Sequence, residues 1–325
     1  MKTDVDYTKY GVTDWSPDIL GDGFEMKYVT HPDDYSGAVR SSIIRKKASP
    51  SNGTAIIYVH GFSDYFFQAE MADMFVSHGY GFYAVDLRKY GRSLLPGQQM
   101  FQVRDLHEYF ADIKACVDEV CVDGISSAIL LGHSTGGLTS SLYMSESPSP
   151  MIKGLILNSP FLDWNKPEWM KRFAIPVVSA LGRMIPRCHV TQKHDDGYAR
   201  SLSSDLDGEW CYKRDWKPDT LPDPDAGWVR AIHTAQRQLR RGRIHVPVLL
   251  MHSAESVRRS DGYEKYHRAD AILDVETISQ YGGRLGADVT EVSFAGGLHD
   301  LVLSRPDVRR QVYDTMLDWL AALTK

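Results

Sequence analysis

One stretch, residues 128–137 (AILLGHSTGG), constrains the fold of this chain more than any other. A short apolar run leads into the pentapeptide GHSTG (132–136), and a second glycine follows it. This G-x-S-x-G pattern is typical of a strand that turns sharply into a helix and carries a nucleophilic serine at the turn. Small residues two positions before and two positions after the serine are needed, because larger side chains there would clash with the neighbouring strands and helices. The pattern therefore predicts a sheet whose carboxyl edge presents Ser134.

The rest of the chain alternates between strand and helix patterns, which predicts an α/β fold with a mostly parallel sheet and helices on both faces. Continuous apolar runs such as AIIYV (55–59) are typical of strands that are buried on both sides. We expect strands at 24–30, 38–46, 55–59, 80–87, 128–132, 152–157, 246–251 and 288–294, and helices at 67–78, 105–122, 136–144, 275–285 and 307–323.

The alternation stops after residue 160 and resumes at residue 245. Tryptophans and prolines concentrate in between, with helical patterns at 167–183 and 226–242 and irregular sequence between them. We therefore predict that residues 161–244 form an inserted helical cap, or lid. Residues 1–160 and 245–325 would form the core, with residues 1–23 as an N-terminal arm.

A histidine suited to activate Ser134 lies close to the C-terminus. His299 follows the last predicted strand and precedes the last predicted helix. It should therefore lie at the same edge of the sheet as the serine, where ligands bind in parallel sheets. His133 is less suitable, because adjacent residues on a turn do not aim at one another. We predict His299 as the general base.

The carboxylate that orients the base should follow the strand at 246–251. The stretch after that strand offers Glu255, Asp261, Asp270 and Asp274. We favour Asp270, which comes shortly before the next predicted helix, and keep Glu255 and Asp274 as alternatives. The order Ser, Asp, His along the chain is the one expected of an α/β-hydrolase.

Two backbone N–H groups are needed to stabilise the oxyanion of an acyl-transfer reaction. We expect one from Thr135, directly after the nucleophile. The other should come from Phe62, which follows His60 and Gly61 at the end of a buried strand. Gly61 would let the backbone approach the reacting group closely.

Seven motifs are spread over residues 59–301: VHGFSDY (59–65), DLRKYGRS (86–93), LGHSTGG (131–137), NSPF (158–161), VPVLLMHS (246–253), ADAILD (269–274) and GGLHDL (296–301). Together they resemble the α/β-hydrolase superfamily, and within it the monoglyceride lipase, lysophospholipase and serine aminopeptidase-like group. The resemblance covers nearly all of residues 24–323. It implies an α/β-hydrolase fold with Ser134 as nucleophile, His299 as base, Asp270 as acid, and Phe62 and Thr135 as oxyanion donors.

The chain departs from the pattern of this group at two places. About sixteen extra residues lie between the strand at 246–251 and Asp270. The usual D-x-R-G-H-G-x-S is replaced by DLRKYGRS, with Lys89 and Tyr90 in place of Gly and His. We expect the second change to remodel the loop and to shape the pocket beside it.

These residues predict a serine hydrolase that cleaves carboxylic esters through an acyl-enzyme, similar to lipases, lysophospholipases and esterases. The aromatic side chains of the predicted cap favour a small-molecule ester with an apolar acyl or aryl group. Amide hydrolysis, aminopeptidase-like or amidase-like, is the alternative, and a non-catalytic binding protein of the same fold is a remote one. The amide alternative depends on a group of acidic residues in the cap, which could bind a substrate amine: Asp195, Asp196, Asp205 and Asp207.

Composition and charge exclude other classes. The formal net charge of −5 gives no reason to expect nucleic acid as a partner. The N-terminal sequence has no apolar stretch typical of a signal peptide, and no run approaches the roughly 20 apolar residues that span a bilayer. We therefore expect a cytoplasmic protein without an integral membrane segment, and no metal or cofactor is implied.

Overall fold

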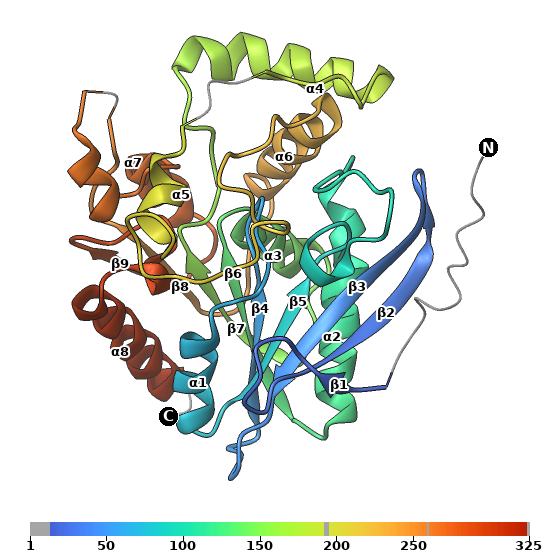
Figure 1. Cartoon of the computed structure of the whole chain (residues 1–325), viewed down its shortest axis with the longest axis vertical. Coiled ribbons are helices and arrows are strands. Elements are labelled where there is room, and N and C mark those ends of the chain that lie inside the picture. Colours follow the sequence, from blue (N-terminus) through green and yellow to red (C-terminus); the bar gives the residue numbers. More distant parts are fainter. Residues whose placement is uncertain (1–13, 192–194, 259, 324–325) are drawn as a thin grey trace.

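The computed structural model describes residues 14–191, 195–258 and 260–323. These residues form one nine-stranded sheet in the order β1-β2-β3-β5-β4-β6-β7-β8-β9 (Figure 1). The strands from β1 to β5 in this order pair antiparallel, and those from β5 to β9 pair parallel. The predicted α/β class with a mostly parallel sheet is thus confirmed. The strands are β1 (Ser16–Pro17), β2 (Glu25–Asp34), β3 (Gly37–Lys46), β4 (Thr54–Val59), β5 (Gly81–Asp86), β6 (Ser127–His133), β7 (Ile152–Asn158), β8 (Val248–Ser253) and β9 (Val289–Phe294).

The central strand β4 is buried on both faces, as its apolar run predicts. Ile57 and Val59 join the core on one side of the sheet, with α2 and α3, while Ile56 and Tyr58 join the core on the other side, with α1 and α8. Burying each large apolar side chain contributes about 1.5–3 kcal/mol. The two cores thereby fix the sheet between layers of helices. The α-helices are α1 (Ala69–Ser77), α2 (Phe110–Val122), α3 (Thr135–Glu146), α4 (Ile175–Met184), α5 (Gly197–Leu202), α6 (Ala226–Leu239), α7 (Val275–Gly282) and α8 (Pro306–Leu323).

The part of the predicted N-terminal arm that is described, residues 14–23, adds an edge strand to the sheet. Residues 1–13 lie outside the described part of the chain. β1 pairs with β2. Next to it, both carboxylate oxygens of Asp18 accept hydrogen bonds from the guanidinium of Arg92, at 2.7 and 2.8 Å. The same guanidinium also donates to Asp86 at the end of β5, at 2.8 Å. The arm is therefore tied to the loop that follows β5.

Two of the predicted helices contain a turn of another helix type before their α-helical part. The helix expected at 105–122 opens with a 3₁₀ turn, Leu106–Tyr109, whose N-cap Asp105 and Glu108 form a capping box. The helix expected at 167–183 opens with a π-helical turn, Met170–Ala174, before α4. Pro176 lies in the first turn of α4 and has no N–H to donate to a carbonyl one turn back, which explains the change of helix type there.

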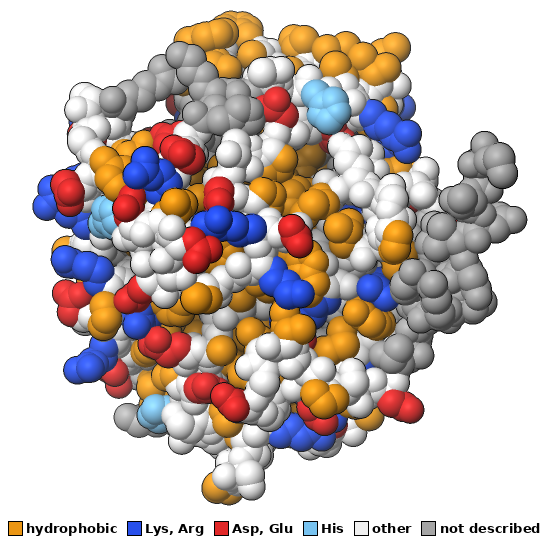
Figure 2. Space-filling view, viewed as in Figure 1, with side chains coloured by type: hydrophobic (Ala, Val, Ile, Leu, Met, Phe, Trp, Pro, Cys, Tyr) orange, Lys and Arg blue, Asp and Glu red, His pale blue; other side chains and the backbone are white. Residues whose placement is uncertain are grey.

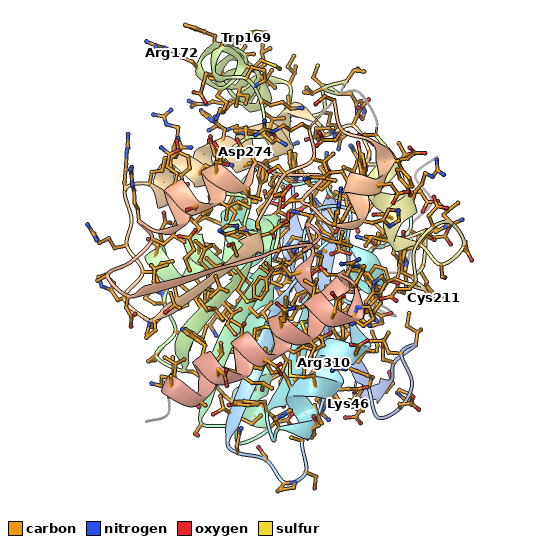
Figure 3. The ribbon with its side chains drawn as sticks, turned by 90° about the vertical axis from the view of Figure 1, so that its left-hand side faces the viewer. Lys46, Trp169, Arg172, Cys211, Asp274 and Arg310 are labelled. Carbon is orange, nitrogen blue, oxygen red and sulfur yellow. The ribbon has the colours of Figure 1, made fainter. Side chains whose placement is uncertain are left out.

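The segment between β7 and β8 contains α4, α5 and α6. α4 and α6 lie beyond the carboxyl ends of the strands, with α4 outermost (Figure 1). The two helices approach so closely that a Cβ on Gly182 would lie 2.0 Å from the carbonyl oxygen of Ala226. The other face of the 169–184 region is uncovered within the described chain: Trp169 is 63% exposed and points outward (Figure 3), and hydrophobic side chains gather along this edge (Figure 2). In the described part of the chain, no helix combines the length and apolar character needed to cross a membrane.

Candidate active site

Ser134 lies on the tight turn between β6 and α3, with φ 52° and ψ −116°. A non-glycine residue seldom adopts this conformation, and such strain clusters at functional sites. Close packing explains the flanking glycines. A Cβ on Gly136 would lie 2.3 Å from the carbonyl oxygens of Val59 and His60, and one on Gly132 would lie 2.7 Å from the carbonyl oxygen of Gly136. The small residues therefore let α3 start directly against the end of β4.

The structure brings His299 to Ser134 from the loop after β9. Nε2 of His299 lies 3.0 Å from Oγ of Ser134, and Nδ1 lies 2.9 Å from Oδ2 of Asp270. All three side chains are buried. The three predicted residues thus form one continuous hydrogen-bonded chain, with the imidazole between the hydroxyl and the carboxylate.

Asp270 reaches His299 because the long loop after β8 folds back on its own start. The amide of Asp270 donates to the carbonyl of Glu255 at 2.9 Å, and its carbonyl accepts from Val257 at 2.7 Å. Its Oδ1 accepts from the amides of Ile272 and Leu273, both at 2.8 Å, which leaves Oδ2 for the imidazole. Between these paired ends the chain makes an excursion, whose described residues are 258 and 260–268. We call it the excursion below.

The alternative carboxylates have other partners. Glu255 forms an ion pair with Lys265, inside the excursion. Asp274 is the N-cap of α7, and its side chain accepts from the amide of Glu276 at 3.1 Å. Asp261 accepts from the amide of Arg258 at 2.8 Å. Of the four carboxylates that the sequence offers, Asp270 is the one that the structure brings to His299.

The two predicted oxyanion donors lie on segments that flank Ser134. Thr135 is the first residue of α3. The segment before Phe62 runs directly beside Ser134: a Cβ on Gly61 would lie 3.1 Å from the Cβ of Ser134. The side chain of Phe62 packs against Trp228 of α6, with ring centroids 4.6 Å apart.

A cavity of about 1440 Å³ opens in front of Ser134 and His299. One part of its wall is aromatic: Phe62, Phe161, Trp164 and Trp228 line it and contact one another edge to face or tilted. The remainder carries charged side chains from the segment between β7 and β8 and from the loop after β8. The site therefore combines an apolar wall with a polar one around the hydroxyl of Ser134.

The two unusual residues in the loop after β5 do not line this cavity, so the prediction that they shape the pocket is wrong. Nζ of Lys89 forms a buried ion pair with Asp34 at 2.6 Å. The buried ring of Tyr90 packs on His60, with centroids 4.8 Å apart, and on Phe101. Tyr90 thus packs beneath the loop that carries Phe62, whereas Lys89 is paired at the end of β2.

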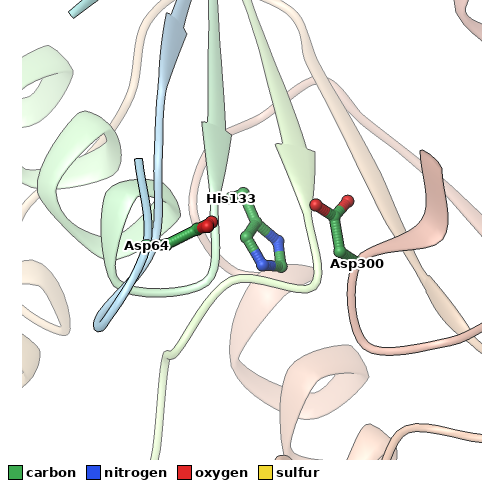
Figure 4. A group of neighbouring side chains, drawn as sticks. All are labelled: Asp64, His133 and Asp300. Atoms are coloured by element: carbon green, nitrogen blue, oxygen red, sulfur yellow. The ribbon is translucent and has the colours of Figure 1, made fainter. Parts of the chain in front are cut away.

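A second buried polar group, not predicted from the sequence, lies behind the turn that carries Ser134. His133 lies between Asp64 and Asp300 (Figure 4), with candidate ligand atoms of all three within 4.8 Å of one another. Each carboxylate already has protein partners. Asp64 accepts from Lys217 at 2.9 Å, and Asp300 accepts from Asn158 at 2.6 Å. Both carboxylates therefore have hydrogen-bond partners within the described part of the chain.

The electrostatics of this group argue against His133 as a base. Burial lowers the pKa of His133, although the carboxylate of Asp300 acts in the opposite direction. Its Nδ1 donates to the backbone carbonyl of Asn158 at 3.1 Å. A neutral imidazole in this position supports the turn, and its ring lies beside that of His299, with centroids 4.9 Å apart. The sequence signal for this group is the placement of Asp64 and Asp300 within the motifs VHGFSDY (59–65) and GGLHDL (296–301).

Known proteins with similar sequences match part of this chain. Phospholipase YtpA of Bacillus subtilis (strain 168) is 31% identical over 108 residues, which is 33% of this chain and 40% of that protein. The bifunctional esterase/perhydrolase DCH of Acinetobacter calcoaceticus is 29% identical over 137 residues, 41% of this chain and 45% of that protein. The chain thus aligns with less than half the length of each of these relatives.

Solved structures match over nearly the whole chain. The monoacylglycerol lipase of Paleococcus ferrophilus superimposes with a TM-score of 0.63 at 19% identity, covering 88% of this chain and 99% of that one. A soluble variant of the monoglyceride lipase of Saccharomyces cerevisiae gives 0.63 at 19% identity, covering 95% and 94%. At such identities the similarity establishes the α/β-hydrolase fold. The family described as serine aminopeptidase, S33, matches residues 50–303, most of the chain. This chain is therefore an α/β hydrolase and a member of the serine aminopeptidase S33 family.

Proposed function

We propose that this protein hydrolyses carboxylic esters, with Ser134 as nucleophile, His299 as base and Asp270 as the orienting acid. The observation that carries the proposal is the hydrogen-bonded chain from Oγ of Ser134 through both ring nitrogens of His299 to Oδ2 of Asp270. Such a chain lets the imidazole accept the serine proton while the carboxylate stabilises the resulting cation. Phospholipase YtpA and the bifunctional esterase/perhydrolase support an ester as the substrate.

The reaction has two steps. In the first, Nε2 of His299 takes the proton of Ser134 as Oγ attacks the ester carbonyl. The backbone N–H groups of Phe62 and Thr135 donate to the oxyanion, and the alcohol leaves with the proton held by His299. In the second, His299 takes a proton from water, which attacks the acyl carbonyl; the bond to Oγ of Ser134 then breaks, the acid is released, and His299 gives the proton to Oγ.

The proposed cap, residues 161–244, and the proposed core, residues 1–160 and 245–325, enclose the cavity together. In the aromatic wall, Trp228 of the cap packs against Phe62 of the core, and Trp164 of the cap packs against Trp228. Phe62 is also a proposed oxyanion donor, so this wall lies next to the place where the acyl carbonyl would bind. This arrangement supports an apolar acyl or aryl group as the acyl part of the substrate.

Amide hydrolysis is less well supported, because the acidic group that would bind a substrate amine is largely occupied. The side chain of Asp195 accepts from Tyr266 at 2.5 Å, and that of Asp207 accepts from Arg200 and Tyr263 at 3.0 and 2.9 Å. Asp205 faces Arg214 at 3.4 Å. Three of the four carboxylates thus have partners within the protein.

The test is a chain-length series of p-nitrophenyl esters, from acetate to palmitate, together with labelling by a fluorophosphonate. We expect turnover and labelling of the wild type, and neither with Ser134→Ala at an unchanged thermal midpoint. Turnover that survives in Ser134→Ala would overturn the proposal. Labelling of the wild type without turnover of any ester would favour the amide reaction, and a lack of both would favour the non-catalytic binding protein.

A further inference from the structure

One side chain from the segment between β7 and β8 contacts the loop that carries His299. The backbone N–H of Asp300, the residue after His299, donates to Oη of Tyr198 at 3.0 Å. The ring of Tyr198 also meets the ring of His299 edge-on, with centroids 5.9 Å apart and planes at 75°. Tyr198 therefore contacts both the imidazole and the peptide group that follows it.

The other contacts of this imidazole come from the strands and loops of the sheet. Ser134 and Asp270 bond its two nitrogens, and His133 lies beside its ring. Tyr198 differs because it belongs to α5, a six-residue helix between β7 and β8. The position of the His299 loop is thus linked to the position of α5, a helix in the segment between β7 and β8.

The same short helix also packs on the excursion that precedes Asp270. A Cβ on Gly197 would lie 2.5 Å from a ring carbon of Tyr266, so the backbone of α5 lies directly on that ring. Oη of Tyr266 donates to Asp195, just before α5. On the far side of α5, Asp207 receives a hydrogen bond from Tyr263. Both tyrosines lie on the 3₁₀ turn Tyr263–His267 of the excursion.

α5 therefore connects the loop that holds the acid to the loop that holds the base. The paired ends of the excursion fix the backbone of Asp270, and its tip holds α5. In turn, α5 presents Tyr198 to His299 and Asp300. Resting on the proposed ester hydrolysis, we propose that Tyr198 is a positioning residue for His299, held in place by the packing of α5 on the excursion.

The direct test is Tyr198→Phe, which keeps the ring and removes the acceptor of the Asp300 N–H. An amide that loses its partner at a buried loop weakens the alignment of the base, so we expect kcat for p-nitrophenyl acetate to fall about tenfold. KM should stay within about twofold, and the rate of labelling by a fluorophosphonate should fall in parallel with kcat. The matched control is Tyr80→Phe, a tyrosine that does not line the cavity.

Tyr198 also lines the cavity, so a role in substrate binding must be separated from positioning. If it acts on the substrate alone, Tyr198→Phe should raise KM and leave kcat and the labelling rate unchanged, which would overturn the inference. A second variant, Gly197→Ala, displaces α5 from the ring of Tyr266 without changing Tyr198. We expect it to lower kcat in the same way, and an unchanged kcat would overturn the role of the packing.

The two proposals fail in different ways. If Ser134→Ala still turns over esters, the proposed function itself is wrong. If the wild type is labelled and active, Ser134→Ala is inert, and Tyr198→Phe matches the wild type in kcat and labelling rate, only the positioning role is wrong. Thermal midpoints of the variants within a few degrees of the wild type show that the comparison concerns folded protein.

Discussion

Oδ2 of Asp270 lies 2.9 Å from Nδ1 of His299, although the excursion separates this carboxylate from the end of β8. The pairing of Asp270 with Glu255 and Val257 closes the excursion at its base. Asp270 therefore lies at the edge of the sheet, close to the end of β8, although the excursion precedes it in the sequence. Its position is set by backbone hydrogen bonds, not by the length of the loop.

Asp270→Asn should lower kcat for the preferred ester by about 10⁴-fold, because an amide in this place favours the wrong imidazole tautomer. Glu255→Gln and Asp274→Asn are matched controls, since each removes one carboxylate from the same loop region. Asn is as good an N-cap as Asp, so Asp274→Asn should also leave the free energy of unfolding almost unchanged. A loss of activity in either control comparable to that of Asp270→Asn would assign the acid elsewhere.

Gly136→Ala should disrupt the catalytic turn, because the new Cβ would lie 2.3 Å from two backbone carbonyl oxygens that cannot move independently. We expect a loss of about 1–3 kcal/mol in the free energy of unfolding, measured in urea, and a loss of fluorophosphonate labelling. Gly262→Ala is the control, since its Cβ would have no neighbour within 4 Å. Equal effects of the two substitutions would show that steric crowding at the start of α3 does not cause the loss of stability and labelling.

Trp164→Ala should reduce kcat/KM for long-chain esters by about tenfold and change the value for acetate little, since an aromatic contact is worth roughly 0.5–1.5 kcal/mol beyond its area. Trp164 lines the cavity and meets Phe161 edge-on, at a centroid distance of 5.2 Å. The same substitution at Trp169, which is 63% exposed on the outer edge of the molecule (Figure 3), provides the control. A uniform loss across all chain lengths would place Trp164 outside the acyl pocket.

Stability should fall on acidification through the ordinary histidine pKa of 6.5, in part because of His31. Burial lowers the pKa of His31, and nearby Arg88 adds to this, although Asp112 opposes it. Below 6.5 the unfolded chain therefore binds more protons than the folded one, so stability is lost as the pH drops towards the folded value. In urea unfolding at pH 7.5 and 5.5, His31→Gln should show a smaller difference between the two pH values than the wild type. A difference that is unchanged or larger would contradict the role of His31.

Much of the fold follows from local sequence patterns. The run AIIYV is a strand buried on both faces, because Ile56 and Ile57 point to opposite sides and meet separate cores. The strands expected at 24–30 and 38–46 are also present, as the antiparallel neighbours β2 and β3. In the first case the information lies in a continuous apolar run, and in the second it lies in two strand patterns that a short turn separates.

What the sequence patterns missed depends on contacts between distant parts of the chain. α5 lies in a segment predicted as irregular, because Gly197–Leu202 is too short for a clear period and is held by Tyr266. The partners of Asp64 and Asp300, Lys217 and Asn158, are likewise far away in the sequence. The place of Asp270 shortly before a predicted helix favours it as the acid, but no local sequence pattern predicts the backbone pairing with Glu255 and Val257 that brings it to His299.

The contact between Asp18 and Arg92 affects how the N-terminal region can be engineered. Arg92 is almost fully buried and bonds Asp86 as well, so removing Asp18 would leave a buried guanidinium with fewer acceptors. Asp86 in turn accepts from the amide of Phe66 at 2.8 Å, a few residues after the proposed oxyanion donor Phe62. A fusion partner or an affinity tag therefore belongs upstream of β1, and trimming that passes Asp18 should disturb the loop on which substrate turnover would depend.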